Sequence, residues 1–186
     1  TVTFEMLLAH RSGATDDLSH FENRQLWSDL WQPTLAPRDG RMLVIEHVLS
    51  VEPTYEPGSV FRYSNAGYMI AAGILERLTG QTYEQLLAQR LWDPLTMTSC
   101  GFGAPGDPNA QEPDQPWPHR VTANGPQPIA PDFYADNPPS MHPAGGMHCS
   151  MADWAKFLKL HSDGFNGKPT PVLHAASFTK LHTPYP

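Results

Sequence analysis

The sequence reads Glu56-Pro-Gly-Ser-Val-Phe-Arg-Tyr63-Ser64-Asn65-Ala-Gly-Tyr68 at the point where an irregular segment gives way to an apolar one. The residues from Ala66 to Leu78 are nearly all apolar, which predicts a helix that is buried on most sides. Gly80 follows at the position where helices commonly end in a left-handed residue. Ser64 or Asn65 can cap the beginning of this helix, and such a cap would also fix where Tyr63 points.

Helical patterns also lie on either side of this segment. The predicted helices are one over 4–9 capped by Thr3, one capped by Asp39 and closed by Pro53, one from the capping box Thr82-Tyr-Glu-Gln85 to Asp93-Pro94, one that begins at Ser150-Met-Ala-Asp153, and one over 174–181. The clearest strand signal is the short stretch Ser59–Tyr63. We therefore predict a mainly α fold with long Pro-rich irregular loops and no large sheet.

Proline is concentrated in one region. Eleven of the 20 prolines lie between Gly101 and Met147, and each one fixes φ and removes a backbone donor. Apolar side chains such as Trp117 and Phe133 can anchor this region, so we expect an ordered loop region. The predicted organisation is a single helical domain over 1–186, with helices and the tyrosine segment in 1–100, the Pro-rich region in 101–147, and C-terminal helices in 148–186.

Composition excludes several classes of function. The net charge is −7 with 12 Lys and Arg in 186 residues, which argues against nucleic-acid binding. No apolar stretch approaches the ~20 residues that a membrane span needs. The opening Thr1-Val-Thr-Phe-Glu5 has no signal-peptide pattern, and the sequence leaves the compartment open.

The metal-ligating side chains are scattered. There is no H-E-x-x-H motif, and His142 and His148 stand six apart in an expected loop without an obvious third ligand, so we predict no metal site and no organic cofactor. Cys100 and Cys149 could form a disulfide, but two buried free thiols are the interpretation that we favour. We interpret Gly145-Gly146 as a tight turn.

Four segments, in order along the chain, resemble the serine β-lactamase (class C), penicillin-binding protein and family VIII esterase superfamily. They are Leu7-Leu-Ala-His10-Arg-Ser12-Gly13, Tyr63-Ser64-Asn65, Pro94-Leu-Thr96-Met97, and Pro143-Ala-Gly-Gly-Met147 with the helix start that follows. Thr96 departs from the family pattern, which has glycine there. The resemblance covers nearly the whole chain and implies the helical part of the β-lactamase/transpeptidase-like fold, without most of its antiparallel sheet.

The resemblance implies a role for two residues. In this superfamily Tyr63 would be the general base that takes the proton of a nucleophilic serine, and Asn65 would orient the substrate and a lysine by hydrogen bonds. His10 and Ser12 look like a hydrolase pair, but the resemblance gives that stretch a supporting role, so we assign them no catalytic function.

The other two elements of the superfamily, S-x-x-K and K-T-G or H-x-G, are not found at their expected places. The string Ser177-Phe-Thr-Lys180 has the first pattern but stands at the wrong end of the chain, and so short a pattern occurs easily by chance. A phenol ionises near pH 10 in water and is a poor base at neutral pH without neighbouring cations. We therefore expect a fragment or truncated homologue of an ester, β-lactam or D-amino-acid peptide hydrolase that is inactive alone.

Two other hypotheses are consistent with the sequence. The chain could be a non-catalytic helical module that self-associates as a homodimer or binds a partner, because an apolar face would be left uncovered without the rest of the fold. Alternatively, another chain that carries the serine could complete the site.

Overall fold

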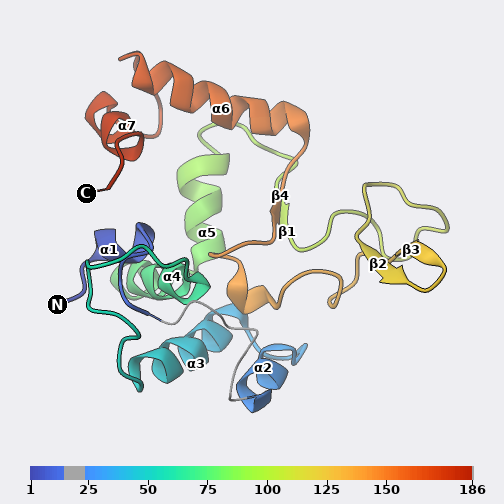
Figure 1. The fold of residues 1–186 in the computed structure, drawn as a ribbon. Coiled ribbons are helices and arrows are strands. Elements are labelled where there is room, and N and C mark those ends of the chain that lie inside the picture. The colour runs from blue at the N-terminus through green and yellow to red at the C-terminus, as the bar shows by residue number, and fades with distance from the viewer. Residues whose placement is uncertain (15–23, 186) are drawn as a thin grey trace. The chain divides into compact units, whose positions relative to one another are not determined.

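The computed structural model describes residues 1–14 and 24–185 of the chain (Figure 1). These residues fold into two compact units, each assembled from two separate stretches of sequence. Unit 1 comprises Thr1–Tyr83 and Phe102–Met147, and unit 2 comprises Glu84–Gly101 and His148–Pro186. No helix in the described part of the chain combines the length and apolarity needed to cross a membrane.

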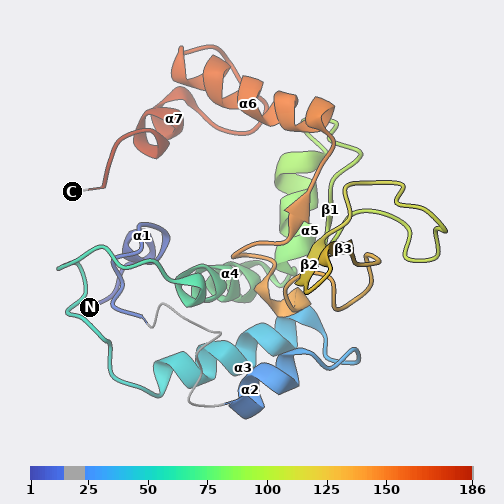
Figure 2. The ribbon, with the colours of Figure 1, turned by 45° about the vertical axis from the view of Figure 1, so that its right-hand side comes forward.

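Unit 1 is built mainly from helices. Its elements are α1 (Phe4–Leu8), α2 (Arg24–Leu30), α3 (Pro37–Leu49), α4 (Asn65–Thr79), the hairpin strands β2 (His119–Thr122) and β3 (Gly125–Pro128), and the 3-10 helix η2 (Pro139–Met141). Helices α3 and α4 pack against each other in both views of the ribbon (Figures 1 and 2). The core joins α2, α3, α4 and η2 through Leu26, Leu30, Val44, Val48, Ala66, Met69 and Met141.

Helix α4 confirms the helix that was predicted from its apolar run. The Ser64 hydroxyl accepts the N–H of Gly67 at 3.1 Å and so caps the helix. Gly80 ends it at φ 74°, in the left-handed region. The expected burial on most sides is only partly correct: Met69 is fully buried, but Leu78 on another side of the helix is 77% exposed.

A buried ion pair links the two central helices of unit 1. Arg41 of α3 and Glu76 of α4 are both enclosed, and the guanidinium donates to both carboxylate oxygens. The backbone N–H of Tyr83 also donates to Glu76 Oε1 at 2.8 Å. Two buried charges are tolerated here because they pair with each other and the carboxylate accepts one further hydrogen bond, from the Tyr83 N–H.

Three details of unit 1 differ from the sequence-based expectations. Ala36 occupies the N-cap position of α3, and Pro37 follows in the first turn. Proline suits this position because an N–H there would have no partner in the helix. Asp39 lies inside that first turn rather than at the cap. Helix α2 was not predicted, and Ser59–Tyr63 is irregular rather than a strand.

The Pro-rich region contains a hairpin that the sequence analysis did not predict. Strands β2 and β3 pair antiparallel, and Thr122 stands opposite Gly125. Gly125 has φ 94°, and the Thr122 hydroxyl donates to its carbonyl at 2.8 Å, which closes the turn. Aromatic packing anchors the region as expected, since the rings of Phe133 and Tyr134 both contact the ring of Trp31.

Unit 2 contains α5 (Tyr83–Leu87, which begins at the unit boundary), the π-helix η1 (Ala88–Trp92), α6 (Met151–Phe165) and α7 (Ala175–Leu181). The predicted start of α6 is confirmed, because the Ser150 hydroxyl accepts the N–H of Asp153. Helix α7 packs on α6 through Phe178, which is fully buried. A Cβ at Gly164 would lie 2.1 Å from the Phe178 ring, so glycine permits this close approach.

Thr96 has φ 53°, the left-handed conformation that a β-branched residue rarely adopts. This backbone explains why glycine suits the position in the resembling motif. Two contacts hold the threonine there: Lys156 Nζ donates to its carbonyl at 2.6 Å, and its N–H donates to the Asp93 carbonyl at 3.0 Å.

The expectation of two free thiols is wrong, because Cys100 and Cys149 form a disulfide. Strands β1 (Gly101–Phe102) and β4 (Met147–His148) pair with each other, and each cysteine adjoins one of them. The pairing brings the two Cα atoms to 4.1 Å, although 49 positions separate them in sequence. The spacing of the two cysteines in the sequence does not reveal that the strands beside them pair.

Loss of this disulfide is expected to lower the free energy of unfolding by about 2–4 kcal/mol, because the cross-link restricts a long loop in the unfolded chain. Urea denaturation of wild type and of the Cys100→Ala/Cys149→Ala variant, each with and without dithiothreitol, measures the effect. Reductant should destabilise wild type alone and leave the variant unchanged. Equal stability of the two proteins under oxidising conditions would contradict the assignment.

Candidate active site around Tyr63

Tyr63 is positioned by the beginning of α4. Ser64, the next residue, is the N-cap of α4. Tyr63 therefore precedes the helix, and its side chain is 53% exposed. The Tyr63 hydroxyl donates a hydrogen bond to Asn65 Oδ1 at 2.9 Å. The structure thus brings together the two residues that the sequence analysis singled out.

A second segment of unit 1 runs alongside the residues before Tyr63. The N–H of Gly58 donates to the Arg11 carbonyl at 2.8 Å, and the N–H of Arg62 donates to the His10 carbonyl at 2.7 Å. The N–H of Ser64 donates to Nδ1 of His10 at 3.0 Å. The His-x-Ser-Gly stretch therefore holds the segment that leads into α4.

The imidazole of His10 lies among three aromatic rings. Its centroid is 4.6 Å from the Tyr63 ring, 5.1 Å from Tyr68 and 5.6 Å from Phe61. This partial burial lowers the pKa of His10, so the neutral imidazole predominates at neutral pH. The sequence analysis gave His10 no part in the site, and helical or strand periodicity could not have revealed this contact.

Among the described residues, the basic side chain that contacts Tyr63 is His10, which packs against the ring rather than the hydroxyl. Within 1–14 and 24–185, no hydrogen bond or ion pair joins the Tyr63 hydroxyl to a lysine or serine side chain. Ser177 and Lys180 lie in α7 of unit 2, whereas Tyr63 belongs to unit 1. As placed here, the phenol is a hydrogen-bond donor to Asn65.

The glycine pair and His142, which the sequence analysis also considered, make contacts within the fold. Gly146 has φ 87° and its carbonyl accepts the N–H of Gly103 at 2.7 Å, which fits a tight turn. His142 stacks on the Phe102 ring with a centroid distance of 4.4 Å. The described residues hold no group of three or more His, Cys, Asp or Glu side chains arranged to bind a metal ion.

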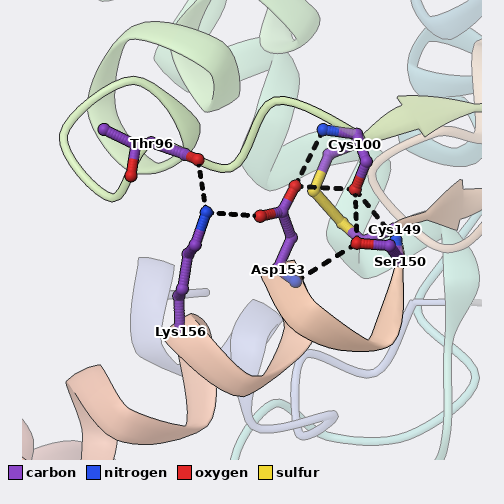
Figure 3. Close-up of a disulfide and its surroundings, with 7 residues drawn as sticks. Thr96, Cys100, Cys149, Ser150, Asp153 and Lys156 are labelled. Atoms are coloured by element: carbon purple, nitrogen blue, oxygen red, sulfur yellow. Dashed lines mark hydrogen bonds and ion pairs between the residues drawn. A yellow bond between two sulfur atoms is a disulfide. The ribbon is translucent and has the colours of Figure 1, made fainter.

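Unit 2 contains a polar network beside the disulfide (Figure 3). Asp153 Oδ2 accepts the hydroxyl of Ser99 at 2.6 Å, and Lys156 Nζ donates to Asp153 Oδ1 at 2.6 Å. The bonds from Lys156 and Ser99 lower the pKa of Asp153 to about 2. Asp153 is therefore ionised above that pH, and the network ties the start of α6 to the chain before Cys100.

Solved structures with the same fold identify the architecture. The penicillin binding protein from Bacillus halodurans aligns with a TM-score of 0.69 at 21% identity, over 99% of this chain and 51% of that one. The D-stereospecific amidohydrolase from Streptomyces sp. gives 0.67 at 19% identity, over 98% and 51%. The octameric penicillin-binding protein homologue from Pyrococcus abyssi gives 0.65 at 24% identity, over 98% and 38%. The chain therefore shares the fold of a part of each of these proteins, which amounts to between 38% and 51% of their length.

The Beta-lactamase family model matches residues 1–184, so this chain belongs to the Beta-lactamase family. Penicillin-binding protein 4 of Amycolatopsis lactamdurans is 27% identical over 183 residues, which are 95% of this chain and 42% of the relative. Lovastatin esterase of Penicillium rubens is 28% identical over 102 residues, or 54% of this chain and 24% of the relative. The chain spans less than half the length of these curated relatives.

Proposed function

We propose that this chain supplies the tyrosine element of a serine acyl hydrolase. One observation carries the proposal: the Tyr63 hydroxyl is exposed at the beginning of α4 and hydrogen-bonded to Asn65, in a chain of the Beta-lactamase family. In the complete site, the serine hydroxyl attacks the substrate carbonyl and passes its proton to Tyr63, which returns it to the leaving group. Water then releases the acyl group from the serine.

The substrates that we propose are esters, β-lactams or D-amino-acid peptides and amides. All three share a carbonyl that an activated serine can attack. The names of relatives support this range, which includes a penicillin-binding protein, an esterase and a D-stereospecific amidohydrolase. The chemistry needs neither a metal nor an organic cofactor.

We propose further that the chain is the helical portion of the fold and that it is inactive alone. The reason for inactivity is chemical. A phenol that acts as a base must lose its proton, and a nearby ammonium group makes that loss possible near neutral pH. Among the described residues, Tyr63 has a hydrogen bond to the uncharged Asn65 and no ion pair.

Covalent labelling tests the proposal. A fluorescent penicillin and a fluorophosphonate should label a protein that contains this chain together with an S-x-x-K serine, and should leave this chain alone unlabelled. The Ser177→Ala variant examines the one S-x-x-K string, and Ser162→Ala in α6 is its matched control. If the isolated chain is labelled and Ser177→Ala abolishes the label, the assignment of inactivity is overturned. If the longer protein is not labelled by either probe, the assignment as an acyl hydrolase fails.

A second candidate function is self-association through an apolar face. Helices α3 and α4 line an open cavity of about 940 Å³, and its apolar lining (the α3–α4 face) includes Met42, Ile45, Val48, Leu49, Ile70 and Ile74. Leu49 is 70% exposed. Monomers rarely expose large apolar patches, and one homologue of the same fold is octameric. We propose that a second copy covers this face, although a complementing chain could use it as well.

Sedimentation velocity at micromolar concentration should therefore show a dimer. The Leu49→Glu variant is expected to shift it to monomer, because a charge would be buried in the apolar interface. Leu158→Glu, at an exposed position of α6, serves as the control and should remain dimeric. A wild-type monomer at these concentrations would exclude self-association and leave the complementing chain as the remaining occupant.

A further inference from the structure

We propose that His10 is a positioning residue for Tyr63, acting through a neutral imidazole whose Nδ1 accepts the N–H of Ser64 and whose ring packs against the phenol. This inference rests on the proposed function of Tyr63, and it adds a residue outside the Tyr-x-Asn segment.

The backbone of His10 adopts an uncommon conformation. His10 follows directly after the C-cap of α1 and has φ 57°, in the left-handed region. Histidine, asparagine and aspartate are enriched there among residues other than glycine, but the conformation is still uncommon. Here it turns the His10 carbonyl toward Arg62, whose N–H donates to it at 2.7 Å. The same turn presents the side chain to the residues that follow Arg62.

The Nδ1 atom of His10 accepts a hydrogen bond from the backbone next to Tyr63. Ser64 is the residue between Tyr63 and Asn65, and it is 1% exposed. As the N-cap, Ser64 uses its side chain to accept the N–H of Gly67, while its own N–H meets His10 Nδ1 at 3.0 Å. Acceptance requires a lone pair on Nδ1, so the single ring proton of the neutral imidazole must lie on Nε2. If Nδ1 carried the proton, it would be a donor facing the N–H donor of Ser64, and no hydrogen bond could form between them.

The ring of His10 packs against the ring of Tyr63. The imidazole and phenol rings are inclined by 36° with centroids 4.6 Å apart, so one face of the phenol is covered by His10. At its far end, the phenol hydroxyl is bonded to Asn65. The phenol is thus held at two places, at its ring by His10 and at its oxygen by Asn65. A side chain exposed over half its surface would otherwise sample several rotamers.

Two variants separate the side chain of His10 from its backbone. Glycine adopts a positive φ without strain, so His10→Gly keeps the turn and removes the acceptor and the ring. Asparagine also tolerates this conformation, and its Oδ1 can accept the Ser64 N–H in place of Nδ1. Both variants should fold, which circular dichroism and thermal unfolding will check, and His119→Asn on strand β2 is the control.

Nuclear magnetic resonance on this chain provides the direct test. The ¹⁵N shifts of the wild-type imidazole should show an unprotonated Nδ1 and a protonated Nε2. The Ser64 amide resonance should move strongly in His10→Gly and little in His10→Asn, and the Tyr63 ring resonances should lose their contacts to His10 in both. A protonated Nδ1 at neutral pH, or unchanged Ser64 and Tyr63 resonances in His10→Gly, would overturn the proposal whatever the activity of the protein.

Ester hydrolysis by the protein that also carries the serine completes the test. His10→Gly should lower kcat by about tenfold to a hundredfold, as expected for a displaced catalytic group, with little change in KM. His10→Asn should recover part of the lost kcat, because it restores an acceptor for the Ser64 N–H but not the ring that packs against the phenol; a merely stabilising role does not require this partial rescue. If the wild-type protein shows the expected resonances but does not hydrolyse esters, the result counts against the proposed function. The placement of Tyr63 by His10 would still be supported. Equal kcat in wild type and His10→Gly would refute the positioning role.

Discussion

Substitution of Tyr63 by phenylalanine is expected to lower kcat/KM for ester hydrolysis by about 10²–10⁴-fold in a protein that contains this chain and the serine nucleophile, the range typical of a lost general base. Phenylalanine keeps the ring and its packing against His10. It removes the oxygen that would accept the serine's proton in the proposed mechanism and that now donates to Asn65 at 2.9 Å. Because the proton is transferred in the transition state, the loss should fall on kcat rather than on KM.

Tyr68→Phe is the matched control for this experiment. Tyr68 also contacts His10, and its hydroxyl donates to the Leu8 carbonyl at 3.0 Å. Its loss removes one exposed hydrogen bond outside the Tyr-x-Asn segment and should leave hydrolysis nearly unchanged. Steady-state kinetics on both variants, with circular dichroism to verify folding, give the comparison. If Tyr63→Phe retains wild-type kcat, Tyr63 is not the base and the proposed mechanism is wrong.

Local signals were sufficient for much of the fold. The N-caps Thr3 and Ser150, the left-handed stop at Gly80 and the apolar run of α4 each depend on residues within one or two helical turns. Such features follow from short-range hydrogen bonds and periodicity, so they can be predicted from one sequence. Helix α2 has no strong cap or long apolar period, and its Leu26 and Leu30 are explained only by the core that they join.

Features that depend on distant segments could not be predicted in this way. A disulfide between Cys100 and Cys149 was considered but two free thiols were favoured, because nothing local indicates that β1 and β4 pair. The same limit applied to His10, which meets Ser64 across 54 positions. Tyr63 and Asn65 were identified because the motif that contains them is contiguous, whereas the residue that holds the motif in place is not part of it.

The buried ion pair of unit 1 leads to the largest expected effect on stability. Arg41→Met should lower the free energy of unfolding by about 3–5 kcal/mol, because it leaves the Glu76 carboxylate enclosed without its counter-charge. That loss is a large share of the roughly 5–15 kcal/mol that stabilises a typical domain. Lys159→Met is the control, since Lys159 pairs with Asp163 on the exposed surface of α6 and its side chain is well solvated.

The double variant Arg41→Met/Glu76→Gln distinguishes a missing charge partner from lost packing. Glutamine is neutral and keeps an oxygen that can accept the N–H of Tyr83, which Glu76 Oε1 now accepts at 2.8 Å. Urea denaturation should therefore show the double variant to be more stable than Arg41→Met alone, because the enclosed side chain at position 76 no longer carries a charge. If the second substitution instead adds to the loss, the cost of Arg41→Met comes from the packing of the long arginine side chain between α3 and α4. If Arg41→Met leaves the stability unchanged, the Glu76 carboxylate must contact solvent or another cation once Arg41 is removed. The burial of both side chains argues against this outcome.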